Sequence, residues 1–330
     1  MATQSASQPS DWRSGLLLPT HIVPIKYDLA IAPDLINFTF QGSVKIHMKV
    51  KEATHDVVCH SYELSYPQDA PNRPQVRLYR DRDRDQVLVQ SCSSIELDEE
   101  SQRVRFNFND IIPAGDYVLE VVFTGILNDQ LCGFYRSAYV SARDGSSKFM
   151  GVTQFEATDC RRAIPCWDEP SVKAIFAVTL IVEPTQTAIS NMPVTRCQTI
   201  LQSKEEQRND TAMRHLIVPK GWIRYIYADS PIMSSYLLAF IVGEFDYLST
   251  FADNRASVPS SRPVEIRIYT PVGETKSGEF ALDVATKCLS LYESFFQLPY
   301  PLPKLDLIAI PDFASGSGIQ RSTHTRAHMY

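Results

Sequence analysis

The segment Ile25–Ile31 reads IKYDLAI, and its apolar side chains occupy every second position. Such alternation is typical of a strand that has one face in a hydrophobic core and the other in water. The polar residues Lys26 and Asp28 fall on the opposite face. The residues expected on the buried face are Ile25, Tyr27, Leu29 and Ile31.

The same period of two recurs along the first 180 residues. The segments that show it are VKIHMKV (44–50), RVRFNF (103–108), YVLEVVF (117–123) and FAVTLIV (176–182). Several short alternating strands, bounded by turn residues, favour sheets packed face to face over a parallel sheet fed by helices. We therefore predict a mainly β fold built around an antiparallel β-sandwich.

Composition and charge exclude several classes of function. The 330 residues carry a net charge of -6, with acidic and basic residues mixed along the chain, which leaves no basic surface for a nucleic acid backbone. The amino terminus lacks the charged-then-apolar order of a secretion signal, and the longest apolar run, YLLAFIV, is far shorter than the about 20 residues that cross a bilayer. The 7 cysteines form no C-x-x-C pair, which indicates reduced thiols. We expect a cytoplasmic protein with no nucleic-acid or membrane partner.

The pattern changes after a polar stretch at 251–263 that is rich in serine and proline, which we interpret as a linker. A strand at 264–269, a helix over about 274–297 and a strand at 305–311 follow, as at the start of an α/β domain. The helix carries one apolar stripe, formed by Phe280, Val284, Cys288, Leu291, Tyr292 and Phe295. With so little chain to cover this stripe, we expect residues beyond about 255 to fray, to pack on the sandwich or to promote association.

Four short motifs carry a family resemblance: GFYRS (133–137), TQFE (153–156), CRRAIPCWDEP (160–170) and SNMP (190–193). In this order they closely resemble the amino-terminal domain of zinc aminopeptidases of the aminopeptidase N superfamily, in particular the puromycin-sensitive branch. The resemblance extends from about Leu16 to Gly316. It implies a saddle-shaped β-sandwich followed by the start of a thermolysin-like catalytic domain.

The resulting domain prediction has five parts. They are a disordered amino terminus (1–15), the sandwich (16–250), the linker (251–263), the truncated start of the catalytic domain (264–316) and a divergent tail (317–330).

The resemblance also implies a function and two substrate-binding residues. Family members remove single residues from peptide amino termini, using zinc held by H-E-x-x-H and a distant glutamate. Carried over to TQFE, Glu156 would bind the α-ammonium of the substrate, and Gln154 would line the pocket for its first side chain. A carboxylate can bind that cation through charge-assisted hydrogen bonds. Outside the family context, a lone carboxylate beside a strand is more often a solvated surface group.

Other residues of the motifs have a structural interpretation. Asp168 and Glu169 are adjacent, so on an extended chain they point to opposite faces, and we expect them to pair with Arg161 or Arg162. Cys160 stands where the family usually has alanine. A place in the core or in a subsite wall suits this thiol better than a role as nucleophile, because no histidine is near in sequence to activate it.

The resemblance ends after PDFASG (311–316). The family continues there with Gly-Ala-Met-Glu-Asn and later with its zinc motif, whereas this chain reads SGIQRSTHTRAHMY. His324 and His328 have the spacing of zinc ligands on a helix, but Thr325 replaces the glutamate that must act as general base. We interpret the pair as accidental. No catalytic residue and no metal ligand is predicted, and the family's zinc is not expected on this chain.

Three functional hypotheses follow. The first is the amino-terminal portion of a zinc aminopeptidase, inactive by itself and binding peptide amino termini weakly. The second is a non-catalytic interaction module, a short isoform that binds the missing catalytic half or another protein. The third, an active enzyme that uses HTRAH, can be tested by substitution of His324.

Overall fold

The computed structural model describes residues 12–13, 15–67, 76–82, 85–201, 216, 218–255, 257–313 and 326–329. The large sheet has eight strands in the order β13-β14-β11-β1-β2-β8-β4-β5. Its strands are β1 (Ile22–Asp34), β2 (Thr39–Val50), β4 (Val76–Arg82), β5 (Asp85–Ser91), β8 (Gly115–Ile126), β11 (Ile175–Val182), β13 (Val194–Thr199) and β14 (Ile223–Tyr227). All neighbours pair antiparallel except β1 and β11, which are parallel.

Two smaller sheets complete the sandwich. One has the order β3-β7-β6, with β3 (Thr54–His60), β6 (Ser94–Asp98) and β7 (Arg103–Ile112). The other has the order β12-β15-β10-β9, with β9 (Gly133–Val140), β10 (Ser147–Gln154), β12 (Thr187–Ser190) and β15 (Phe240–Gly243). Short 3-10 helices lie at η1 (Cys160–Arg162) and η2 (Ser235–Leu237). The prediction of a mainly β fold is confirmed.

One large hydrophobic core joins these three sheets. Tyr27 of β1 stacks on Phe176 of β11 with ring centroids 4.9 Å apart, and Phe134 of β9 contacts Phe240 of β15 at 4.9 Å. Tyr27, Leu29 and Ile31 are buried as predicted. Ile25 is the exception: the β1–β2 register shifts between Pro24 and Lys26, and this bulge leaves the Ile25 side chain 48% exposed.

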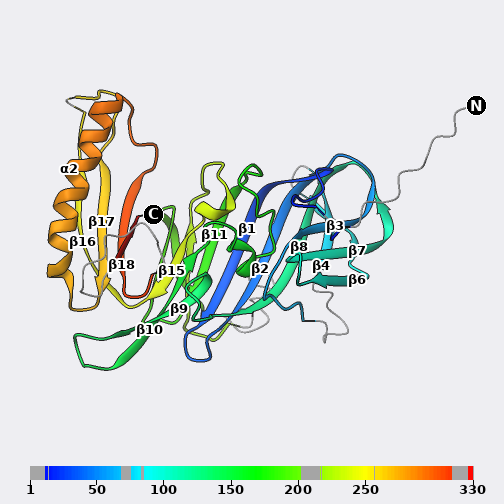
Figure 1. The fold of residues 1–330 in the computed structure, drawn as a ribbon, viewed down its shortest axis with the longest axis horizontal. Coiled ribbons are helices and arrows are strands. Elements are labelled where there is room, and N and C mark those ends of the chain that lie inside the picture. Colours follow the sequence, from blue (N-terminus) through cyan, green and yellow to red (C-terminus); the bar gives the residue numbers. More distant parts are fainter. Residues whose placement is uncertain are drawn as a thin grey trace, which may run out of the picture.

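The last sheet has the order β16-β17-β18-β19, with β16 (Phe245–Ala252), β17 (Val264–Pro271), β18 (Lys304–Ile310) and β19 (Arg326–Met329). The 3-10 helix η3 (Thr275–Gly278) and α2 (Glu279–Phe296) connect β17 to β18, which are parallel. Residues 253–263 connect β16 to β17, which are neighbours in this sheet. The chain therefore passes from the sandwich to the last sheet before Phe245, upstream of the stretch 251–263 that composition marks as a linker. In Figure 1 this sheet and α2 form one end of an elongated molecule.

The helix α2 ends where the local sequence dictates. Gln297 ends it in a left-handed conformation with a φ of 53°, and prolines at 299, 301 and 303 cannot continue a helix. The buried carboxylate of Glu293 accepts hydrogen bonds from the Tyr300 amide at 2.6 Å and from Ser261, which anchors this end to the loops beside it. In the part of the chain that the structure describes, no helix has the length and hydrophobicity required to cross a bilayer.

Candidate functional site

Gln154 is the last residue of β10, and Glu156 follows it after one buried residue. Gln154 pairs with Gly133 of β9, which fixes its position in the sheet. Between the two polar residues, Phe155 inserts into the core and contacts Phe240 at a centroid distance of 5.9 Å. The backbone of TQFE is therefore held by a buried aromatic anchor, while Gln154 is half-buried and Glu156 is exposed.

The side chain of Gln154 lies on the face of its sheet that meets the last sheet. Val152, two residues earlier on β10, belongs to the same apolar cluster as Ile308 and Ile310 of β18. Because side chains alternate along a strand, Val152 and Gln154 share a face. The strand opposite carries Tyr135, which pairs with Val152. Gln154 thus lies at the edge of the contact between the sandwich and the last sheet.

Hydrogen bonds fasten the end of β18 to this edge. The Tyr135 hydroxyl donates to the carbonyl of Asp312 at 2.8 Å, and the Asp312 amide donates to the Ser137 hydroxyl at 3.2 Å. These two bonds join residues 177 and 175 positions apart in the chain. They bring the segment that follows β18 alongside the strand that flanks Gln154.

The Glu156 carboxylate is exposed to solvent. Among the residues that the structure describes, none donates a hydrogen bond to it or pairs with it, and the side chain is exposed. An unpaired carboxylate on a rigid backbone can accept charge-assisted hydrogen bonds from an ammonium group. Both sequence-predicted site residues therefore lie at one edge of the sandwich, next to the last sheet.

Arg162 supports the loop that carries Glu156, and sequence reasoning assigned it no role at the site. Its guanidinium group contacts Asp159 and Glu63 at 2.7 Å each and lies 4.6 Å from the ring centroid of Tyr62. It also packs below Gly133, where a Cβ atom would lie 2.7 Å from the Arg162 Cβ. Gly133 has a φ of 70°, so both its conformation and its close contact favour glycine. Of these contact residues, only Asp159 is close to Arg162 in the sequence, three positions before it. Local sequence patterns therefore could not predict the others.

The expected pairing of Asp168 with an arginine is confirmed. Asp168 is buried and accepts a hydrogen bond from Arg161 Nε at 3.1 Å and another from the Ser235 hydroxyl at 2.6 Å. Its amide donates to His60 Nδ1 at 3.2 Å. Glu169 does not pair with either arginine, because its carboxylate accepts the amide of Leu18 at 2.6 Å. Both carboxylates are thus structural, and they hold the loop after η1 in place.

Cys160, Cys166 and Asp168 form a buried group whose ligand atoms lie within 4.8 Å of one another. For Cys160 the sequence predicts a place in the core or in a subsite wall, and this thiol is buried. Burial raises the pKa of the Cys160 and Cys166 thiols, whereas metals bind the thiolate. Both Asp168 oxygens are already used by Arg161 and Ser235. The group therefore does not fit a metal ion, and we interpret it as core packing.

His324 and His328 of HTRAH have the spacing of zinc ligands on a helix. His324 lies outside the described residues, but residues 326–329 form strand β19, which pairs antiparallel with β18. Two histidines four residues apart share a metal only where the chain is helical. The extended conformation of 326–329 therefore does not suit a zinc site built on this pair.

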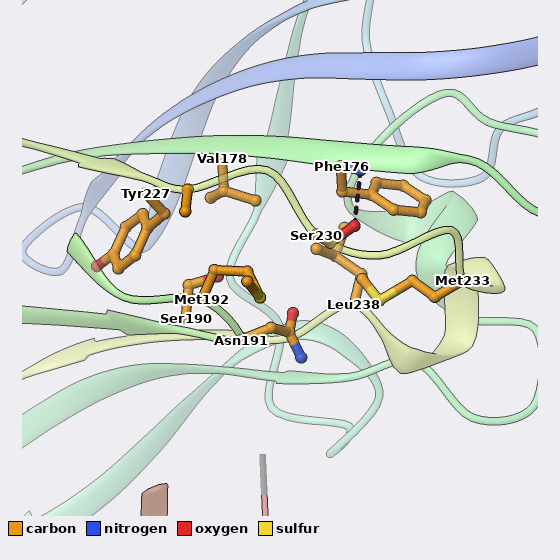
Figure 2. A pocket seen from close by; sticks show the side chains of 10 residues that line it. Phe176, Val178, Ser190, Asn191, Met192, Tyr227, Ser230, Met233 and Leu238 are labelled. Atoms are coloured by element: carbon orange, nitrogen blue, oxygen red, sulfur yellow. Dashed lines mark hydrogen bonds between the residues drawn. The ribbon is translucent and has the colours of Figure 1, made fainter. Parts of the chain in front are cut away.

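Figure 2 shows a small cavity between β11 and the SNMP motif. Its walls are mostly apolar and include Phe176, Val178, Met192, Met233 and Leu238. Ser230, which also lines it, donates its hydroxyl hydrogen bond to the carbonyl of Pro231 at 2.7 Å. The cavity holds no ionisable side chain apart from Tyr227, whose pKa is raised by burial. We assign it no role in chemistry.

Comparison with known proteins places these features in a family. Residues 23–237 match the Peptidase M1 N-terminal domain, and residues 280–321 match the Peptidase family M1 domain. The chain is 41% identical over 317 residues to Aminopeptidase M1-A of Oryza sativa subsp. japonica, which covers 96% of this chain and 31% of the rice protein. Aminopeptidase M1 of Arabidopsis thaliana is 39% identical over 301 residues, covering 91% of this chain and 30% of the relative.

A fungal relative shows the same coverage. Alanine/arginine aminopeptidase of Saccharomyces cerevisiae is 34% identical over 308 residues, which cover 91% of this chain and 30% of the yeast protein. The chain thus spans about 30% of the length of these relatives and matches their amino-terminal portion.

Proposed function

Because the chain belongs to the peptidase M1 family, we propose that it supplies the part of an aminopeptidase that binds the substrate's free amino terminus. The observation that carries this proposal is the exposed Glu156 carboxylate, which has no partner among the described residues and lies on an anchored backbone, beside Gln154 at the junction with the last sheet. Glu156 would accept hydrogen bonds from the α-ammonium group, and Gln154 would contact the first side chain of the peptide.

The hydrolytic step requires residues outside the described part of this chain. M1 aminopeptidases are zinc enzymes in general, but neither the cysteine group nor the HTRAH pair fits zinc. The chain by itself is expected to release no amino acid from an unblocked peptide, and His324→Ala is expected to leave that result unchanged.

The test of Glu156 is a binding titration of the 330-residue chain with an unblocked tripeptide, followed by NMR or calorimetry. An exposed ion pair contributes at most about 1 kcal/mol, whereas millimolar affinity takes about 4 kcal/mol, so we expect a dissociation constant of about 1 mM or weaker. Glu156→Gln should weaken binding about fivefold. Equal affinity for the tripeptide and its N-acetylated form would refute recognition of the amino group.

A matched control separates local from general charge effects. Glu52 is also exposed and lies in the turn between β2 and β3, so Glu52→Gln removes the same charge elsewhere. This variant should bind the tripeptide as the unchanged chain does. Gln154→Ala should change the ranking of tripeptides that differ in their first side chain, while acetylation of the tripeptide should still weaken its binding.

A second role, as a non-catalytic interaction module, is favoured by one observation. The helix α2 exposes several large apolar side chains, which a partner polypeptide would cover.

We also propose a cytoplasmic location, which is supported by seven cysteines that are all unpaired. Cell fractionation with an antibody against residues 133–193 would test that location.

A further inference from the structure

The helix α2 is apolar on two sides, and only one of them is covered. Ala285 and Leu289 pack against Ile266, Ile268 and Leu305 of the last sheet. The opposite side, which we term the outer face of α2, faces solvent. It consists of Phe280, Val284, Leu291 and Phe295, and the exposed rings of Tyr292 and Phe296 lie beside it. A helix that is apolar around most of its circumference is an interior element of a larger fold.

The exposure of the outer face is large for a folded protein. Phe280 is 79% exposed and Phe295 is 75% exposed, near opposite ends of the helix. Phe280 and Val284 are four residues apart, as are Leu291 and Phe295, so they form two adjacent pairs along one side of the helix. In Figure 1 α2 lies at one end of the molecule, beside the strands of the last sheet. Monomeric proteins rarely leave a contiguous apolar surface of this kind uncovered.

The charged groups along the outer face form an ion pair, so they add no net charge that would repel a protein partner. Lys287 lies between the two pairs and is neutralised by Asp283, with 2.7 Å between Nζ and Oδ2. The aromatic rings already contact one another, with centroids 5.0 Å apart for Phe295 and Phe296 and 6.2 Å apart for Tyr292 and Phe296. Aromatic side chains grouped in this way are the residues that dominate the binding energy of protein interfaces.

The family comparison identifies the kind of partner. The match to the Peptidase family M1 domain begins at residue 280, the first aromatic residue of the outer face. The relatives are about three times as long as the matched region, because that region covers 31% of the rice protein. We infer that the outer face of α2 binds the polypeptide that follows this region in M1 aminopeptidases. This inference rests on the proposed function, since it takes the partner to be the peptidase part of the same family.

The test is co-expression of the 330-residue chain with the part of rice Aminopeptidase M1-A that follows the aligned region. A tag on the rice fragment would be used for capture, and light scattering after size exclusion would give the stoichiometry. We expect a 1:1 complex. Phe295→Glu should weaken it by at least about tenfold, because a charge would be buried in an apolar contact.

Ile36→Glu is the matched control, because Ile36 is also 75% exposed but lies in the turn between β1 and β2. This variant should bind the rice fragment normally. Both substituted residues are exposed, so both variants should fold, and circular dichroism would verify this. Failure to form a complex, or a complex that Phe295→Glu leaves intact, would overturn the inference. A homodimer of the chain that Phe295→Glu dissociates would also overturn it, because the partner would then be a second copy.

The outcome for docking is separate from the outcome for Glu156. If the complex forms but Glu156→Gln does not change peptide binding, the proposed function fails and the docking surface stands. If no complex forms, the tripeptide titration of the chain alone still tests Glu156.

Discussion

His60 shows how its surroundings determine the charge state of a single residue. The imidazole is buried, and its Nδ1 accepts the amide of Asp168 at 3.2 Å. Burial, together with the nearby guanidinium groups of Arg161 and Arg103, lowers the pKa of His60 to about 3. The ring is therefore neutral at physiological pH. It works as a fixed acceptor that holds the loop carrying Asp168, not as a proton donor or general base.

This lowered pKa predicts a pH dependence of stability. The unfolded chain binds a proton at His60 below about pH 6.5, which the folded chain does not until about pH 3. The free energy of unfolding should therefore fall by about 1.4 kcal/mol per pH unit as the pH drops below 6.5. Urea unfolding at several pH values between 6.5, the ordinary pKa of histidine, and about 3, the pKa of His60 in the folded chain, would measure this slope.

His60→Asn provides the control for other titrating groups. The asparagine oxygen can replace Nδ1 as the acceptor but cannot take up a proton in the unfolded chain. This variant should be less stable at pH 8, because the ring packing is lost, yet its stability should fall less steeply under acid. Identical slopes in the two proteins would show that His60 does not cause the effect.

At the scale of elements, β2 and β8 are joined by two reciprocal pairs of phenylalanine and glycine. Phe40 lies opposite Gly125, and Gly42 lies opposite Phe123. Each ring occupies the space that a side chain on the facing glycine would need. A Cβ atom at Gly125 would lie 2.2 Å from the Phe40 ring, and one at Gly42 would lie 2.3 Å from the Phe123 ring. Both rings are fully buried, so neither can move aside cheaply.

Gly125→Ala should therefore destabilise the sandwich even though alanine is the smallest possible addition. Overpacking of a close-packed core costs about 1 to 3 kcal/mol, and thermal or urea unfolding would measure the loss. Phe40→Leu should restore part of that stability in the Gly125→Ala background, because the smaller side chain leaves room for the methyl group. Additive losses in the double variant would contradict the proposed contact.

At the scale of the whole molecule, a buried ion pair joins the last sheet to the sandwich. Lys304 pairs with Asp306 on β18 and donates a hydrogen bond to the carbonyl of Ser190 on β12 at 2.7 Å. Both charged side chains are almost fully buried. Burial lowers the pKa of Lys304. The pair is therefore costly to bury, and its value to the fold depends on both partners being present.

Asp306→Leu should cost about 3 to 5 kcal/mol, because it leaves the Lys304 charge buried without a counterion. The double variant Lys304→Met with Asp306→Leu should regain much of this loss, since it removes the stranded charge. Hydrogen exchange of the β18 amides would show whether the last sheet loosens in the single variant. Equal destabilisation in the single and double variants would argue against the stranded charge as the cause.

Several features follow from the sequence because they depend on neighbours along the chain. The alternation of apolar and polar residues placed Tyr27, Leu29 and Ile31 in the core. The three- and four-residue spacing of apolar residues, together with the prolines after residue 298, located the helix that the structure shows at Glu279–Phe296. The motifs around Glu156 indicated the family, and the comparisons confirmed it. The role of Glu156 remains a prediction.

Only the tertiary structure decided which surfaces meet. Strand pairing places a bulge at Ile25 and exposes it, although the local alternation puts it in the core. The side of α2 that carries Ala285 and Leu289 packs on the sheet, and the outer face, which carries the larger rings of Phe280 and Phe295, does not. Asp168 meets His60, 108 residues away. Such contacts depend on register, side-chain volume and long-range pairing, and local periodicity carries none of these.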